Sequence, residues 1–260
     1  MFNRREFLFT SLAAPLFLSS NKSHAQTAPS GKMLLAMHQN TSRAAGFRQS
    51  LEGWSRAGIK YVELNDTMLD EFLENDSLVG ARNLLDDLGL TPVCAAAALP
   101  DLWIPGPARE SSLEVWRMRC DQMANLGLEK IYSPSVTNRP VTTEDFTATP
   151  EAIREVAVIA SEYNLTCSIE FIRTSTHLAT LSSALNMIRA ADHPNVKPMI
   201  DFFHFWSGMS KLEDLDLLES GELLHCHFQD FLDAPRELTD NSYRVIPGDG
   251  IAPLNSIIRK

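Results

Sequence analysis

Several short stretches of this chain place acids or histidines inside apolar sequence, where a protein core would normally exclude them. The segment 198–206 reads PMIDFFHFW and sets Asp201 and His204 three residues apart. Burying a charge is costly unless the group is paired or bound to a metal, so each of these side chains should have a partner. The runs VEL, SIEF and LLHCHFQD have the same character, and their polar residues are Glu63, Glu170, His225, His227, Gln229 and Asp230.

Alternation along the strands predicts that several of these residues face one interior. Successive residues of a strand point to opposite faces. In 165–171 the apolar residues occupy one face, which leaves Glu170 for the other. The same alternation turns His225 and His227 inward in 222–228, and Glu63 inward in 59–64. Three strands thus direct acids or imidazoles to one interior.

Glu170, Asp201 and His227 are the hardest of these to explain as separate core residues. Two carboxylates that converge without a cation repel each other and shift their pKa values. A divalent metal removes that conflict. The mixed oxygen and nitrogen ligand set favours Mn, Mg or Co over a thiolate-type zinc site, although zinc is also allowed.

Other polar residues of the set have plain structural alternatives. Glu63 is a candidate substrate contact, with equal reason to cap or bridge a neighbouring strand. His225, one position deeper than His227, is expected to be a core histidine satisfied by hydrogen bonds rather than a ligand. Asp230 is suited to capping the helix that follows it.

These residues are positioned by a repeating pattern in which a short apolar run is followed by a polar turn and a helical stretch. Strands that alternate with helices predict a parallel sheet. Seven runs at this chain length favour a (β/α)8 barrel, with a doubly wound open sheet as the alternative. No Gly-rich phosphate loop follows any of the runs. The runs are 33–38, 59–64, 91–98, 129–135, 165–171, 196–202 and 222–228.

Helical periodicity is clearest in 77–90 and 149–165. Thr149-Pro150 followed by Glu151 predicts a helix start, and Gly89 and Gly127 suit helix ends. In either α/β fold the chemistry lies at the carboxyl ends of the strands, which is where the polar residues occur.

Length, charge and the amino-terminal sequence set further limits. A chain of 260 residues fits one large domain or two small ones, and its formal charge of −10 argues against a nucleic-acid partner. Residues 1–25 have a basic start with Arg4-Arg5, a short apolar run and a small-residue site, which resembles a twin-arginine export signal. We therefore expect a signal peptide over 1–25, a barrel domain over 31–260, and an exported or periplasmic protein without stable membrane insertion after cleavage.

The cysteines do not have the spacing of a metal site. They lie scattered inside the periodic elements, so we expect buried free thiols that pack as small hydrophobes, with disulfide pairing as the alternative. They are Cys94, Cys120, Cys167 and Cys226.

The ordered set of SIEF, IDFFH, HCHFQD and YRVIPGDG resembles the xylose isomerase-like TIM-barrel superfamily of sugar isomerases and epimerases. The similarity runs from about Met33 to the last residue. The resemblance implies that Glu170, Asp201 and His227 are metal ligands. It also implies that His204 and Arg244 contact substrate oxygens.

One departure from the family pattern concerns its last strand, which normally delivers a second glutamate as fourth ligand and base. Here the sequence ends at PLNSIIRK, in an expected final helix, so the barrel is expected to be incomplete before strand eight, as a fragment or as a natural variant. The resemblance leaves Glu170 as the base, with Glu63 as first candidate for the second. Trp103, in the loop PDLWIPGP, is a candidate to cover the apolar face of the sugar, with simple packing as the alternative.

The implied reaction is an isomerisation or epimerisation of a keto- or aldo-sugar through an enediolate that a divalent metal stabilises. Two alternatives are a lyase or dehydratase acting on an oxidised sugar or glycoside, and a non-catalytic periplasmic sugar-binding protein. A DNA-repair role is least favoured because the chain is acidic. The expected partner is a small sugar, and a homodimer is an allowed arrangement.

Overall fold

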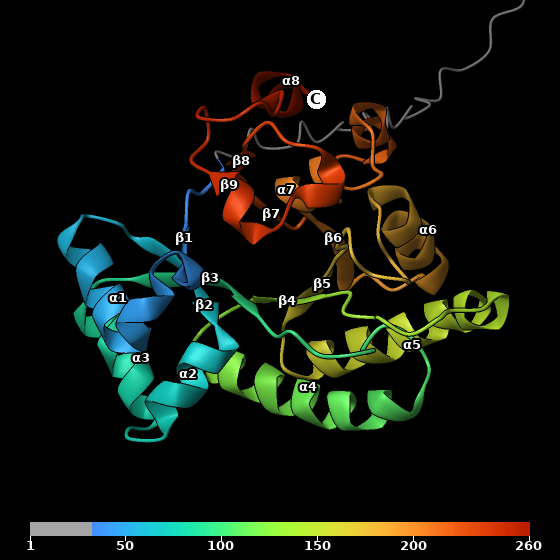
Figure 1. Cartoon of the computed structure of the whole chain (residues 1–260). Coiled ribbons are helices and arrows are strands. Elements are labelled where there is room, and N and C mark those ends of the chain that lie inside the picture. Colours follow the sequence, from blue (N-terminus) through green and yellow to red (C-terminus); the bar gives the residue numbers. More distant parts are fainter. Residues whose placement is uncertain (1–32) are drawn as a thin grey trace, which may run out of the picture. The chain divides into compact units, whose positions relative to one another are not determined.

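A curved sheet of seven parallel strands forms the centre of the computed structural model, which describes residues 33–260 (Figure 1). Neighbouring strands in the sheet follow one another in the chain, whereas a doubly wound sheet reverses its strand order. The strands are β1 (Met37–His38), β2 (Tyr61–Asn65), β3 (Thr91–Ala96), β4 (Lys130–Pro134), β5 (Thr166–Glu170), β6 (Val196–Asp201) and β7 (His225–His227).

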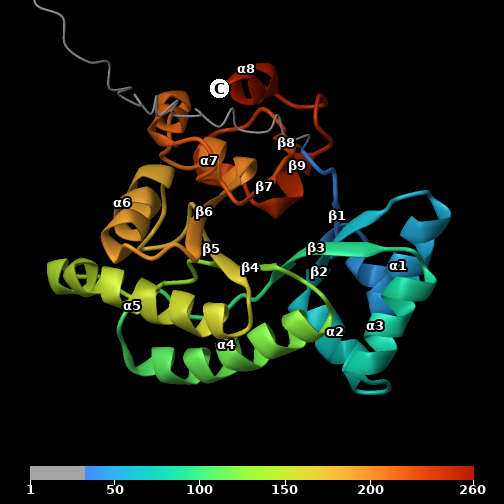
Figure 2. The same ribbon diagram turned by 180° about the vertical axis from the view of Figure 1, so that it is seen from behind.

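Helices cover the outer side of this sheet, as Figures 1 and 2 show. Shorter elements follow β6 and β7, among them an antiparallel pair of two-residue strands, β8 (Asp230–Phe231) and β9 (Arg244–Val245). The α-helices are α1 (Gly46–Arg56), α2 (Asp66–Leu73), α3 (Leu78–Asp87), α4 (Pro107–Asn125), α5 (Thr143–Glu162), α6 (Leu181–Ala191), α7 (Phe202–Ser207) and α8 (Leu254–Arg259). The 3-10 helices are η1 (Gln39–Ala45), η2 (Leu212–Leu217), η3 (Arg236–Leu238) and η4 (Asn241–Tyr243).

The predicted barrel-type α/β fold is confirmed, and so is its incompleteness. β1 and β7 are the two outer strands of the sheet, and within residues 33–260 no further strand pairs with either of them there. The expected export signal over 1–25 lies outside the described residues and stays a prediction. Within the described part, no helix is long and apolar enough to cross a membrane.

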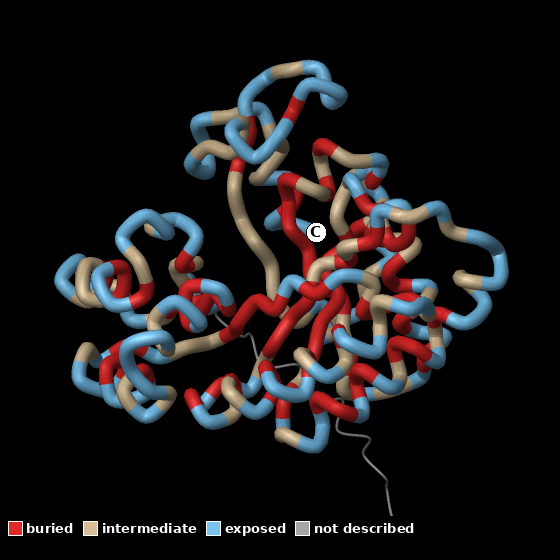
Figure 3. Tube along the Cα trace, turned by 60° about the horizontal axis from the view of Figure 1, so that its bottom comes forward, coloured by how far each residue is buried: buried red, intermediate tan, exposed pale blue. Residues whose placement is uncertain are grey.

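The predicted faces of the residues in β2 and β5 are confirmed. Val62 and Leu64 of β2, and Cys167 and Ile169 of β5, lie in the main hydrophobic core together with helix residues. The residues that alternate with them, on the opposite face of the sheet, include the candidate site residues Glu63 and Glu170. Figure 3 shows that the longest buried stretches follow the central strands. All four cysteines are free thiols, and three of them are buried.

The first strand is shorter than predicted. The run 33–38 contributes only Met37–His38 to the sheet, where these residues pair with Val62 and Glu63. Met33, Leu34 and Leu35 are 77%, 61% and 89% exposed. A strand needs a neighbouring strand to pair with along its length. Because β2 begins only at Tyr61, it offers residues 33–35 no partner.

The start of the fifth helix was also predicted wrongly. α5 begins at Thr143, six residues before Thr149, and Pro150 lies inside it. Thr142 and Asp145 form a capping box, in which each side chain accepts a hydrogen bond from the other residue's backbone N–H. That local pair sets the helix start more strongly than the Thr-Pro pair. The predicted helix ends at Gly89 and Gly127 are confirmed, since both have the positive φ of helix-ending glycines.

A buried imidazole fixes the loop that follows β5. His177 is 4% exposed, and its Nε2 lies 2.8 Å from Thr149 Oγ1. The Thr149 hydroxyl donates its only hydrogen to the carbonyl of Asp145, so Nε2 must be the donor to Thr149. Burial lowers the pKa of His177 to about 4.

This imidazole should make stability depend on pH. The folded protein favours the neutral form, so between pH 6.5 and 4 the unfolded chain binds more protons and stability falls as pH falls. The lowered pKa corresponds to about 2–3 kcal/mol lost between pH 7 and 4.5. Urea unfolding of the wild type and His177→Gln at both pH values measures it. The variant should show the smaller dependence, and equal dependence in both proteins would contradict the assignment.

Candidate metal centre and active site

Four strands of the sheet bring three carboxylates to one histidine. His227 of β7 lies between Glu170 of β5, Asp201 of β6 and Glu63 of β2. Its Nδ1 is 3.5 Å from Glu170 Oε1 and 3.4 Å from Asp201 Oδ2. Its Nε2 is 3.0 Å from Glu63 Oε1. These four residues therefore meet around one imidazole, with Glu63 at its Nε2 and the two other acids at its Nδ1.

The charges of this group are strongly coupled. Glu63, Glu170 and Asp201 are 2%, 6% and 2% exposed. Burial alone would raise the pKa of Glu63, but His227 and His38 outweigh it and hold that pKa well below its ordinary value. Burial would likewise lower the pKa of His227, but the surrounding carboxylates raise it well above its ordinary value. His227 and Glu63 thus stabilise each other's charged forms.

Asp201 holds the start of a helix and also faces the site. Its Oδ1 accepts hydrogen bonds from the backbone N–H groups of Phe203 at 2.8 Å and His204 at 3.2 Å, which caps α7. Arg244 Nη1 donates to Oδ2 at 2.8 Å, and the Gln229 side chain donates to Oδ1. Burial raises the pKa of Asp201, but the hydrogen bond with His227 and the charges of Arg244 and His204 outweigh it and hold that pKa well below its usual range.

The two predicted substrate contacts lie beside this carboxylate. His204 Nε2 is 3.4 Å from Arg244 Nη2, and the Arg244 guanidinium lies 4.2 Å from the centre of the Phe203 ring. His204 is largely buried, which lowers its pKa, whereas the Arg244 side chain is 27% exposed. The structure therefore presents a cationic group to solvent next to the acids.

Asp230 positions Arg244 instead of capping a helix, which corrects the sequence-based interpretation. Its carboxylate accepts hydrogen bonds from the backbone N–H groups of Phe231, Gly248, Gly250 and Ala252. These bonds fold the loop after β9 back onto β8, and β8 pairs with Arg244. A Cβ atom at Gly250 would lie 2.3 Å from the Phe231 carbonyl oxygen, so this close approach requires glycine.

The donor set and its spacing fit a divalent metal. Ligand atoms held 2.0–2.2 Å from a tetrahedral ion are separated by about 3.3–3.6 Å. The Glu170 and Asp201 oxygens lie at about this separation from His227 Nδ1. Glu170, Asp201 and His204 also offer ligand atoms within 4.8 Å of one another. Two carboxylates and an imidazole suit Mn, Mg, Co or Zn.

Trp103 does not reach this site, so the expectation that it covers a sugar is wrong. The side chain is 1% exposed and packs edge-on against Trp116, with ring centres 6.2 Å apart. Its Nε1 donates a hydrogen bond to the Ser133 carbonyl at 3.1 Å. A loop aromatic with both its ring and its donor satisfied in the core has no surface left for a ligand.

Two residues that the sequence analysis did not select also contact the site. His38 Nε2 lies 3.1 Å from Glu63 Oε1 and 3.2 Å from the Tyr132 hydroxyl. His38 ends the first predicted strand, and Tyr132 alternates inward on the fourth, so both carried a signal. His225 is hydrogen-bonded as expected, with its Nε2 2.7 Å from Glu63 Oε2, but its side chain is 16% exposed and so is not fully in the core.

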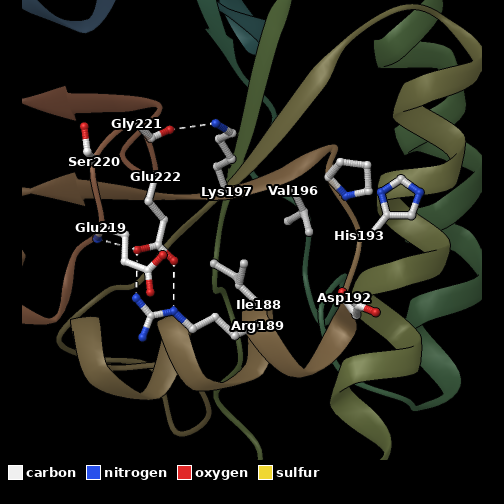
Figure 4. Close-up of a pocket in the computed structure, with 11 residues that line it drawn as sticks. Ile188, Arg189, Asp192, His193, Val196, Lys197, Glu219, Ser220, Gly221 and Glu222 are labelled. Carbon is white, nitrogen blue, oxygen red and sulfur yellow. Dashed lines mark hydrogen bonds and ion pairs between the residues drawn. The ribbon is translucent and has the colours of Figure 1, made fainter. Parts of the chain in front are cut away.

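Another surface depression lies at the opposite end of β6, and its arginine and lysine are already hydrogen-bonded (Figure 4). It measures about 470 Å³ and is lined by the end of α6, the start of β6 and residues 219–222. Arg189 is paired with Glu222 at 2.8 and 2.9 Å, and Lys197 donates to the Gly221 carbonyl. Since a strand rises about 3.3 Å per residue, the two ends of β6 are roughly 16 Å apart. The candidate chemistry therefore lies at the other end of the strand, around Asp201.

Comparison with known proteins agrees with this architecture. Inosose isomerase of Bacillus licheniformis is 24% identical over 221 residues, which cover 83% of this chain and 79% of that protein. The IOLI protein, solved with a binding zinc atom, has a TM-score of 0.78 at 20% identity over 87% of this chain and 84% of its own. The probable 3-DHS dehydratase AsbF from Bacillus anthracis has a TM-score of 0.72 at 18% identity over 87% and 88%.

The family match covers most of the chain. The family model described as xylose isomerase-like TIM barrel matches residues 52–260, a range that includes every residue of the site except His38. The two solved structures share the fold, with identities too low to transfer more than that. On the family match, this chain belongs to the xylose isomerase-like TIM barrel family.

Proposed function

We propose that this protein is a metal-dependent isomerase or epimerase acting on a keto- or aldo-sugar or a related hydroxy-carbonyl compound. The observation that carries the proposal is the convergence of Glu170 and Asp201 on Nδ1 of His227. Sequence similarity to the inosose isomerases supports the reaction class. Arg244 and His204, adjacent to the same carboxylate, are suited to binding the oxygens of such a substrate.

Each residue of the site has a separate part in the proposed reaction. Glu170, Asp201 and His227 would hold one divalent ion, which supplies Lewis-acid stabilisation of negative charge on oxygen. Arg244 and His204 orient the carbonyl and the neighbouring hydroxyl. Glu170 moves the proton between the two adjacent carbons, through an enediolate. A positioned acid–base group of this kind contributes roughly 10²–10⁴-fold to the rate.

Metal analysis followed by solvent exchange tests this proposal. The purified protein should bind about one divalent ion per chain. With that ion present it should exchange one carbon-bound hydrogen of a keto-sugar or inosose for deuterium, measured by NMR in D₂O. Glu170→Gln should lose both properties. Glu151→Gln, the same change at a side chain that is 76% exposed, should keep them.

The same measurement separates the alternative functions. Release of water or of an aglycone after exchange would identify a lyase or dehydratase. Sugar binding with no exchange, in a folded and metal-loaded protein, would identify a binding protein. A folded chain that binds no metal and exchanges no hydrogen would contradict the proposal.

A further inference from the structure

Glu63 lies inside a cage of three imidazoles. Its Oε1 is 3.1 Å from His38 Nε2 and 3.0 Å from His227 Nε2, and its Oε2 is 2.7 Å from His225 Nε2. His38 belongs to β1 and the other two histidines to β7, so the contacts connect the two outer strands of the sheet. The rings of His38 and His227 meet edge-on, with centres 5.0 Å apart.

The cage is built for hydrogen bonds rather than for a second metal. The backbone N–H of Asn40 donates to His38 Nδ1 at 2.9 Å, so Nδ1 uses its lone pair as an acceptor. A neutral imidazole then carries its hydrogen on Nε2, the nitrogen that faces Glu63. A metal at Nε2 would need that lone pair free and would move the hydrogen to Nδ1, against the Asn40 N–H.

The same reasoning applies to His227, whose two nitrogens face different groups. Nε2 faces Glu63 Oε1 at 3.0 Å, while Nδ1 faces Glu170 and Asp201 at 3.5 and 3.4 Å. Binding of an ion would require the charged ring to lose one hydrogen. While Nε2–H still donates to Glu63, the hydrogen lost is the one on Nδ1, which leaves the lone pair of the neutral ring there. That lone pair points to the acids that would share the ion.

We infer that Glu63 is a positioning residue that makes Nδ1 the metal-binding nitrogen of His227. The inference rests on the proposed function. A metal-binding histidine commonly donates its second N–H to a carboxylate, which fixes the ring and its hydrogen. Glu63 is 2% exposed, and both of its oxygens are engaged by imidazoles, so the structure favours this role over the substrate contact or second base expected from sequence.

Zinc affinity of matched variants tests the role. Isothermal titration with Zn²⁺ alone is compared for the wild type, Glu63→Gln and Asp66→Asn. The glutamine turns an N–H₂ group toward an imidazole nitrogen that is itself a donor, so we expect zinc affinity to fall about 10–100-fold. Asp66 is a carboxylate of similar burial, 5% exposed, that contacts the Thr67 backbone and not His227. Its variant should bind zinc as the wild type does.

Nitrogen-15 NMR of the zinc-loaded wild type gives a readout that does not require a variant to fold. His227 should show Nδ1 shifted by metal coordination and Nε2 carrying a hydrogen. Metal at Nε2, or a Glu63→Gln protein with wild-type zinc affinity, would overturn the inference.

The Glu170→Gln variant separates this inference from the proposed function. If Glu170→Gln binds zinc as well as the wild type does, the proposed metal site is wrong. If Glu170→Gln loses zinc while Glu63→Gln keeps it, only the positioning role of Glu63 is wrong.

Discussion

Replacing Asp201 with asparagine should reduce turnover by about 10³-fold, equivalent to about 4 kcal/mol of transition-state stabilisation. Asparagine keeps the oxygen that accepts the backbone N–H groups of Phe203 and His204, so α7 should remain capped. It removes the negative charge that would share the ion with Glu170. Metal affinity should therefore fall by more than the roughly 10–100-fold typical for losing an outer-shell partner.

A second helix-capping carboxylate provides the matched control for this prediction. Asp145 also accepts from a backbone N–H at a helix start and also pairs with an arginine, at 2.8 and 2.9 Å from Arg139. It takes no part in the proposed site. Asp145→Asn should lower stability while leaving metal affinity and hydrogen exchange unchanged. If Asp201→Asn and Asp145→Asn lost activity equally, the loss in Asp201→Asn would come from a less stable helix and not from weaker metal binding.

Replacing Trp103 with alanine should lower the free energy of unfolding by about 3–5 kcal/mol, the usual cost of deleting a buried tryptophan side chain. The indole is 1% exposed and packs against Trp116, so its removal leaves a cavity in the main core. The Ser133 carbonyl also loses its indole donor. Urea denaturation measures the loss, and zinc affinity of the folded variant should equal that of the wild type.

Trp103→Phe divides this effect into its parts. Phenylalanine keeps most of the ring packing but cannot donate to Ser133, so about 1–3 kcal/mol should be lost. The alanine variant should therefore be the less stable of the two. Unchanged stability of Trp103→Ala, together with a raised KM for a sugar, would show instead that the ring contacts substrate.

The alternation of apolar and polar residues was enough to predict which side chains face the interior. In β2, β5 and β7 the apolar neighbours of Glu63, Glu170 and His227 pack against the helices or the core, and a strand has only two faces. The order of strands and helices likewise predicted the parallel sheet. These features depend on residues near one another in the chain, which is why periodicity detects them.

The boundaries and the aromatic loop depended on contacts that periodicity does not contain. β1 is limited to two residues because it pairs with β2 only there. α5 starts at Thr143 because a capping box precedes it. Trp103 lies in a polar loop sequence, and its burial depends on Trp116 and the Ser133 carbonyl, which come from later elements.

The cage around Glu63 was decided by tertiary structure alone. Sequence predicted that Glu63, His225 and His227 face inward, but Glu63 meets these histidines across 162 and 164 residues of chain. Facing inward fixes a direction, whereas the distance between strands that are not neighbours depends on how far the sheet curves. Here the curvature brings His38 of β1 and both histidines of β7 onto the Glu63 carboxylate of β2. These donors make the buried charge of Glu63 stable, because a buried charge needs hydrogen-bonding partners around it.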